Sequence, residues 1–132
     1  MATRAHQFIA ELIARKMNID GFEVISFDGL SESERTKLKI PPKIIRHRPD
    51  LLGIDRQKNI CIGEAKTAGD MGPRTQEQLE DFSSIGVRFY IGIPSSAEWE
   101  LEKMLKKYVQ PNNGLVLVVK VPDRLLPGED HD

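Results

Sequence analysis

Three ionisable side chains near the middle of the chain have the types and the spacing needed for phosphate ester chemistry: Asp50, Glu64 and Lys66. Two neighbouring carboxylates repel each other unless a cation lies between them, and Mg²⁺ commonly binds proteins through only one or two carboxylates. A metal held there polarises a phosphoryl oxygen and lowers the pKa of an attacking water. Lys66 would orient that water or stabilise charge in the transition state. These residue types therefore predict metal-assisted hydrolysis.

The elements that must position these side chains are two apolar-rich runs, residues 44–54 and 59–67, which are separated by a short polar group and predict a β-hairpin. Partners in an antiparallel pair have a constant sum of residue numbers. A turn centred on Gln57 therefore places Asp50 opposite Glu64, with Cβ atoms about 4.5 to 5.5 Å apart. The two carboxylates meet without any long-range assumption.

Lys66 points to the same face as Glu64, because side chains alternate along a strand, and the backbone carbonyl of Ala65 is a further candidate metal ligand. Acids and lysines on a hairpin usually form only a solvated face with weak ion pairs. Here, however, they interrupt the apolar run ICIGEAKT, where folding alone does not call for polar groups.

Hydrophobic periodicity and turn signals define the other elements. In chain order they are a helix over 3–18, a strand over 22–27, a helix over 73–84, a strand over 87–93, a helix from 95 to a break at 111–114, and a buried strand over 115–121. Residues 30–42 are either one or two helical turns or a loop, and Pro41-Pro42 then favours extended backbone. The order α-β-β-β-α-β-α-β indicates one α/β sandwich, a mixed sheet flanked by helices, over residues 1–121, with a flexible tail over 122–132.

Composition is that of one globular domain: 132 residues, 39% apolar and 30% charged, with a net charge of −1. No apolar run approaches the roughly 20 residues that cross a bilayer, and the N-terminal stretch is too charged for a signal peptide, so no membrane partner is expected. Cys61 is the only cysteine, lies between two isoleucines and cannot form an internal disulfide. This fits a cytoplasmic protein.

The run RPDLLGI, a polar turn and the run ICIGEAKT resemble the signature of the PD-(D/E)xK nuclease superfamily, which includes restriction endonucleases and Holliday-junction resolvases. In this sequence the aspartate of the motif is Asp50, its acidic ExK position is Glu64 and its lysine is Lys66. The αβββαβ order, which covers residues 3–121, agrees with that family. The resemblance implies a restriction-endonuclease-like sandwich and DNA hydrolysis dependent on Mg²⁺, with Mn²⁺ as a substitute.

The same resemblance implies two further site residues. Family members often carry a glutamate on the first helix that helps hold the metal, and Glu11 matches it, although an exposed helix residue fits this position nearly as well. Some branches carry a glutamine on the helix after the ExK strand. Gln78 is favoured for this catalytic role over Gln76, and either also fits a surface position.

Basic residues are concentrated just upstream of Asp50, and no acidic residue occurs between residues 35 and 48. Such a stretch would contact phosphates that flank the cut site and would make binding salt-dependent. The candidate DNA-binding residues are Lys37, Lys39, Lys43, Arg46 and Arg48. A solvated loop and edge strand is the alternative interpretation.

The leading hypothesis is therefore a divalent-metal-dependent DNA endonuclease that uses a metal-activated water. The alternative is a catalytically silent DNA-binding or scaffold module with the nuclease fold, which the small size and near-neutral charge favour. An RNA-directed nuclease ranks last, because 6% aromatic residues leave few platforms for unpaired bases. Cutting both strands of a duplex takes two active sites and favours a homodimer, with the helix of Trp99 or the segment 30–42 as candidate interfaces.

Overall fold

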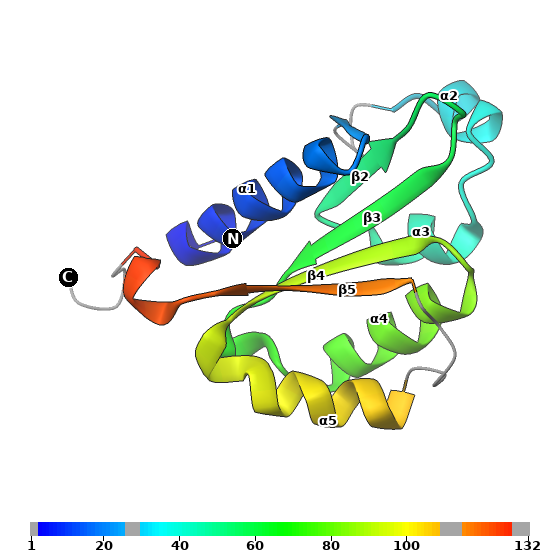
Figure 1. Ribbon diagram of the computed structural model, residues 1–132. Coiled ribbons are helices and arrows are strands. Elements are labelled where there is room, and N and C mark those ends of the chain that lie inside the picture. Colours follow the sequence, from blue (N-terminus) through cyan, green and yellow to red (C-terminus); the bar gives the residue numbers. More distant parts are fainter. Residues whose placement is uncertain (1–2, 26–29, 109–114, 128–132) are drawn as a thin grey trace.

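One mixed β-sheet with helices on both faces forms the computed structural model, which describes residues 3–25, 30–108 and 115–127 (Figure 1). The strand order is β1-β2-β3-β4-β5. The strands are β1 (Glu23–Ile25), β2 (Leu51–Ile54), β3 (Ile60–Ala65), β4 (Arg88–Pro94) and β5 (Val116–Val121). The first three pair antiparallel, whereas β3, β4 and β5 pair parallel. The predicted α/β sandwich with a mixed sheet is confirmed.

α1 (Arg4–Ile19) covers one face of the sheet, and the Thr3 hydroxyl caps its N-terminus by accepting a hydrogen bond from the His6 amide. The residues that it buries have helical spacing: Ala5, Ile9, Ile13 and Met17. The helix lies so close to β4 that a Cβ added to Gly92 would be 2.6 Å from Ile13 Cδ1. Because Gly92 pairs with Ala65 at the end of β3, this close packing brings the first turn of α1 to the carboxyl end of β3.

α4 (Pro73–Ser84) and α5 (Glu98–Tyr108) cover the opposite face, and the short α3 (Pro42–His47) lies beside α4 (Figure 1). Phe82 of α4 packs edge-on against Phe89 of β4, with ring centroids 5.2 Å apart. The bounds of α4 agree with the predicted helix over 73–84.

α2 (Glu32–Lys37) lies in the segment that the sequence leaves undecided between helical turns and a loop. Ser31 and Glu34 form the capping box, in which each side chain bonds the backbone amide of the other residue. The helix buries none of its side chains, so local capping and not core packing defines it.

α3 replaces the first part of the predicted strand over 44–54, and that part of the prediction is wrong. Pro41 is extended, with φ −61° and ψ 144°, as the double proline favours. Pro42, however, occupies the first helical position, where its missing N–H costs no hydrogen bond and its fixed φ suits a helix. Ile44 is fully buried in the resulting turn, so the apolar residues of this run serve a helix instead of a strand.

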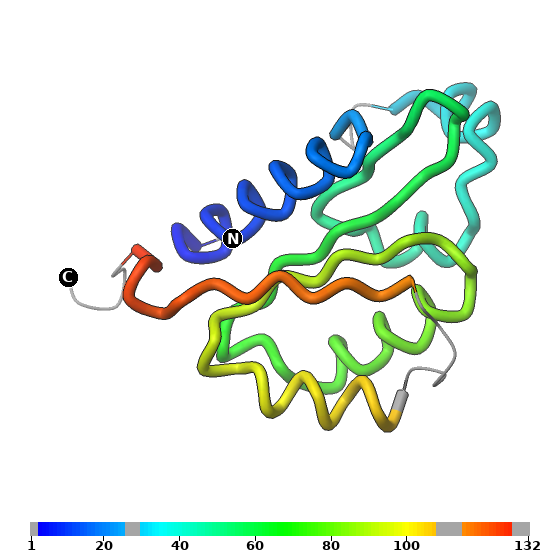
Figure 2. The backbone as a smooth tube through the Cα atoms, in the orientation of Figure 1, coloured from blue at the N-terminus to red at the C-terminus, as the bar shows by residue number. Residues whose placement is uncertain are grey.

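The arms of β2 and β3 run side by side as a hairpin (Figure 2), and they pair in the predicted register. Ile54 pairs with Ile60, and every pair in the ladder has the same sum of residue numbers as the predicted pair of acids. The last pair of the ladder is Leu51 with Gly63, so the ladder stops one pair short of Asp50 and Glu64. Asp50 therefore lies beside the end of β3 and not within a strand.

β5 forms an edge of the sheet, so the prediction of a buried strand is wrong for all of its residues except Val121. Its side chains are mostly half-buried, and Val118 is 39% exposed. An apolar sequence cannot reveal that a strand has a neighbour on one side only.

Beyond β5, the predicted tail begins as an ordered 3-10 turn, η3 (Asp123–Leu125). The carboxylate of Asp123 accepts a hydrogen bond from the Ser96 amide at 2.9 Å, which anchors this turn. Residues 128–132 of the predicted tail, residues 26–27 of the first predicted strand and the break at 111–114 lie outside the described residues. Among the helices that are described, none combines the length and the apolarity needed to span a membrane.

Candidate active site

A cavity of about 490 Å³, here called the β3 cavity, opens where β3 ends, between the first turns of α1 and α4. In α/β sheets, ligands usually bind at the carboxyl ends of the parallel strands, and this is such a place. Four predicted catalytic residues line the β3 cavity: Asp50, Glu64, Lys66 and Gln78. Ala65 also lines it.

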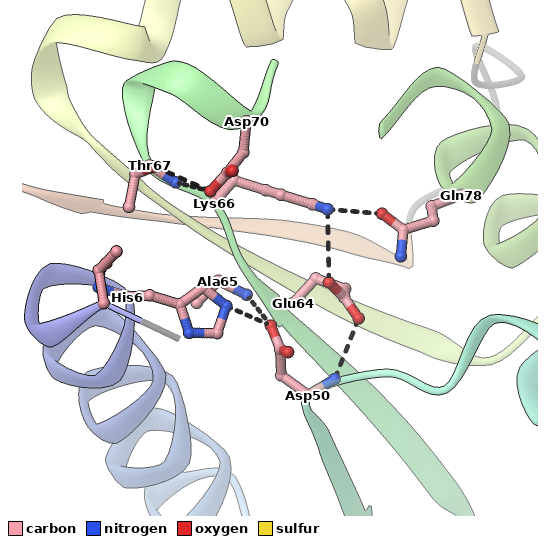
Figure 3. A network of polar contacts seen from close by, with 9 residues as sticks. His6, Asp50, Glu64, Ala65, Lys66, Thr67, Asp70 and Gln78 are labelled. Atoms are coloured by element: carbon pink, nitrogen blue, oxygen red, sulfur yellow. Dashed lines mark hydrogen bonds and ion pairs between the residues drawn. The ribbon is translucent and has the colours of Figure 1, made fainter. Parts of the chain in front are cut away.

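Side-chain hydrogen bonds link the hairpin arms beyond the point where the regular ladder stops (Figure 3). The Asp50 amide donates to Glu64 Oε1 at 3.0 Å, and the Ala65 amide donates to Asp50 Oδ2 at 2.8 Å. Each acid thus accepts from the backbone of the facing arm. The two carboxylates are consequently held side by side.

Glu64 is the most deeply buried acid of the β3 cavity, with 5% of its side chain exposed. Burial, and then the negative charge of Asp50, raise the pKa of Glu64 to about 8. A cation next to the two carboxylates would counteract both effects. The structure therefore contains a buried carboxylate that neighbouring positive charge does not fully compensate.

Lys66 and Gln78 form a buried pair on the same side of the cavity as Glu64 (Figure 3). Lys66 Nζ donates to Gln78 Oε1 at 2.6 Å and lies 3.6 Å from Glu64 Oε2. An ammonium group has only donors, so the amide oxygen of Gln78 is the atom that meets it. Gln78 is 2% exposed, whereas Gln76, the competing candidate, does not line the cavity.

His6, from the first turn of α1, is a cavity residue that the sequence interpretation missed. Its Nε2 lies 3.1 Å from Asp50 Oδ2 (Figure 3). The hydrogen bond to Asp50 is the largest contribution that raises the pKa of His6, against the opposing effect of burial. Burial also opposes the shift of Asp50, but the bonds from His6 and the Ala65 amide outweigh it and lower the pKa of Asp50.

Glu11, the predicted metal ligand of the first helix, is exposed and does not line the β3 cavity. Five residues separate it from His6, which places the two side chains about 140° apart around the helix axis. Helical spacing in the sequence could have indicated His6, because it precedes the buried Ile9 by three residues and lies on the same side of the helix.

The donor atoms at the β3 cavity fit a divalent metal ion of the Mg²⁺ type. Asp50 and Glu64 supply carboxylate oxygens, and Ala65, whose carbonyl is the predicted backbone ligand, lines the same cavity. Such hard oxygen ligands are the ones that Mg²⁺ and Mn²⁺ prefer. A bound cation would also offset the burial and the Asp50 charge that raise the pKa of Glu64.

The predicted DNA-binding residues separate into three groups. Arg48 lines the β3 cavity. Arg46 and Lys43 instead form ion pairs with Asp81 of α4, at 3.1 Å and 3.8 Å. The remaining two, Lys37 and Lys39, are exposed and are not part of the cavity wall.

Arg74 is a second cavity residue that the sequence interpretation missed. It is exposed, in the first turn of α4, and precedes Gln78 by one helical turn. Residues four apart lie on one helix face, so the choice of Gln78 could have suggested Arg74 as well.

A second group of ligand-type residues lies between α3 and α4, and we call it the Asp81 cluster. Ligand atoms of His47, Glu77 and Asp81 are all within 4.8 Å of one another, close enough to hold a metal ion. The hydrogen bond from His47, and also the charges of His47 and Arg46, lower the pKa of Asp81 despite some burial. This carboxylate thus already has positive neighbours, in contrast to Glu64.

Comparison of the chain with models of known protein families, with curated proteins and with solved structures found no match. The geometry and chemistry of the β3 cavity and of the Asp81 cluster are therefore the observations that bear on function.

Proposed function

We propose that the chain is a divalent-metal-dependent endonuclease that hydrolyses DNA phosphodiester bonds at the β3 cavity. One observation carries the proposal: Asp50 and Glu64 stand side by side in an accessible cavity, with the Lys66 ammonium 3.6 Å from Glu64. Paired carboxylates with a fixed ammonium group suit a reaction in which negative charge develops on a phosphate.

Asp50 and Glu64, with the Ala65 carbonyl, are the residues that would hold Mg²⁺, and Mn²⁺ would substitute for it. When bound, the ion would polarise a phosphoryl oxygen and lower the pKa of an attacking water. The protein contributes the rigid placement of both acids, because each accepts a backbone hydrogen bond from the opposite hairpin arm.

Lys66 contributes a positive charge close to the reacting phosphate. Its 10% side-chain exposure and its bond to Gln78 restrict the ammonium to one position. A pre-positioned charge stabilises a transition state without the cost of reorganisation during the reaction. We assign Gln78 to positioning Lys66, since it acts through that side chain.

The spacing of Asp50, Glu64 and Lys66 along two hairpin arms supports membership of the PD-(D/E)xK superfamily as part of the same proposal. The α1 residue beside the acids departs from that family pattern. His6 contacts Asp50, whereas the expected Glu11 points away from the cavity. Metal binding would then depend on the hairpin residues alone.

Cleavage of plasmid DNA in Mg²⁺ or Mn²⁺ tests the proposal. We expect removal of any of the three groups to reduce cleavage by at least about 10²-fold, by analogy with the loss of one preorganised transition-state contact. The near-isosteric variants are Asp50→Asn, Glu64→Gln and Lys66→Met. Matched controls on the exposed side of α5 are Glu102→Gln and Lys106→Met, which should retain activity. Full activity in all three site variants would contradict the assignment, and an RNA of the same sequence tests the substrate class.

A catalytically silent DNA-binding or scaffold module is the second candidate, and one contact favours it. Asp50 Oδ2 already accepts the Ala65 amide at 2.8 Å and lies 3.1 Å from His6 Nε2, so this oxygen has partners without a metal. Calorimetric titration with Mn²⁺ separates the two candidates. Heat of binding that disappears in Asp50→Asn supports the nuclease, whereas no binding at millimolar Mn²⁺ supports the silent module.

Duplex cleavage would require a second active site, and we propose a homodimer for that purpose. Trp99 on α5 is 67% exposed, and Lys103 Nζ lies 3.8 Å from its ring centroid. A large exposed aromatic side chain is common at subunit interfaces. Sedimentation velocity with and without a DNA duplex measures the oligomeric state of the protein. A monomer bound to the duplex would contradict the proposed homodimer.

A further inference from the structure

Arg74 stands at the wall of the β3 cavity with its donors available. Gln78, one helical turn further along α4, is held against Lys66 (Figure 3), so the same helix face carries Arg74 toward the cavity. Across the described ranges 3–25, 30–108 and 115–127, no hydrogen bond or ion pair engages the Arg74 guanidinium. The nearby acid of the wall, Asp70, accepts its hydrogen bonds from Thr67 instead.

Arg48 reaches the same cavity from another element, the connection between α3 and β2. Its backbone is left-handed, with φ 46° and ψ 79°, at the C-terminal cap of α3. This conformation favours glycine, because a Cβ makes it strained, and helices commonly end on glycine for that reason. Lys39 and Lys58 have the same left-handed backbone outside the cavity, so the place of Arg48 on the cavity lining, and not its conformation, points to a function for its side chain.

We propose that Arg74 and Arg48 bind phosphate groups of the substrate strand that neighbour the phosphate to be cut. The identity of the cut bond rests on the proposed function, but the phosphate binding does not. A guanidinium group presents planar, paired donors that match phosphate oxygens, and it stays charged at any working pH. Two such groups beside one cavity select a polyanionic nucleic acid strand over an isolated phosphate ester.

The proposed phosphate-binding surface differs from the basic segment over residues 35–48 that the sequence suggested. Lys43 and Arg46 neutralise Asp81, and Lys37 and Lys39 lie outside the cavity wall. Among the residues predicted from that segment, Arg48 alone belongs to the new pair. Charge loss at Lys37 or Lys39 is therefore a matched control for charge loss at Arg74.

Fluorescence anisotropy with a short fluorescein-labelled DNA duplex, in EDTA and over a range of salt concentrations, tests the proposal without cleavage. We expect Arg74→Met and Arg48→Met each to weaken binding about tenfold, the loss of one charged hydrogen-bonded contact. Each should also reduce the slope of log K against log salt by about 0.9. Arg74→Lys should keep the slope but regain only part of the affinity, since it retains charge without the planar donors.

The control variants Lys37→Met and Lys39→Met should bind like the wild type. Equal affinity and slope in wild type and both arginine variants would overturn the proposal, as would an absence of DNA binding by the wild type. Cleavage in Mn²⁺, measured on the same proteins, separates this result from the proposed function. Arginine-dependent binding without any cleavage supports the phosphate site and contradicts the nuclease, whereas cleavage with unchanged KM in Arg74→Met contradicts the phosphate site only.

Discussion

Two histidine–aspartate pairs lie within the described part of the chain: His6 contacts Asp50 at the end of β3, and His47 contacts Asp81 between α3 and α4. Each pair has a second carboxylate nearby, Glu77 beside Asp81 and Glu64 beside Asp50. Arg46 and Lys43 add positive charge directly at Asp81, whereas Lys66 lies 3.6 Å from Glu64, which is far more deeply buried.

The pKa values record this difference. That of Asp81 is lowered, first through its bond from His47, whereas burial and the charge of Asp50 raise that of Glu64 to about 8. The positive neighbours of Asp81 favour its charged form without a metal, whereas we propose that Glu64 depends on an added cation for the same effect. Similar residue types can serve either purpose, and charge balance distinguishes the two.

The largest test of this contrast is the pH dependence of stability in metal-free protein. Glu64 has a folded pKa of about 8, above its ordinary 4.5, so the folded state holds the extra proton between these values. The free energy of unfolding should therefore fall as pH rises from about 4.5 to about 8, by a few kcal/mol at about 1.36 kcal/mol per pKa unit. Urea unfolding in EDTA measures it, and Glu64→Gln should flatten the profile.

Asp81 should show the opposite sign in the same experiment. Its folded pKa is below its ordinary 3.8, so it stabilises the fold above that value, and the contribution is lost as pH falls through the folded pKa. Asp81→Asn should change the profile only at acid pH. If Glu64→Gln leaves the neutral-pH slope unchanged, the two carboxylates do not differ as described.

Metal binding gives the next largest expected effect. Mn²⁺ at a hundred times its Kd should stabilise the wild type by about 2.7 kcal/mol, because only the folded state joins Asp50 and Glu64 in one site. Thermal unfolding by circular dichroism measures the shift in Tm. Asp50→Asn should abolish it and Asp81→Asn should preserve it; the reverse pattern would assign the metal to the Asp81 cluster.

The smallest effects concern the Asp81 cluster itself. Asp81→Asn should destabilise the fold by about 2 kcal/mol, since the buried His47 loses its charged partner. Arg46→Met should cost less than about 1 kcal/mol, because its side chain is 63% exposed and surface ion pairs contribute little. Denaturant titration measures the free energy of unfolding of both variants. A larger loss in Arg46→Met than in Asp81→Asn would show that surface charge holds α3 to α4.

Local patterns in the sequence determined the hairpin register and the bounds of α4. Both depend on neighbours in the chain: a fixed sum of residue numbers across a short turn, and proline at a first helical position. The same local information misassigned residues 44–47, because buried apolar residues before a strand suit a short helix equally well.

Tertiary structure alone decided which side chains complete the β3 cavity. His6 reaches Asp50 because α1 packs closely over Gly92, and Arg74 reaches the cavity because α4 docks beside the end of β3. Burial, too, depends on the whole fold: Glu64 is enclosed within the sheet, whereas Val118 is exposed at its edge. The sequence by itself determined the three reactive residue types and their common face. Only the packing of distant helices set their charge balance, since electrostatic energy depends on distance in space and on burial, not on separation along the chain.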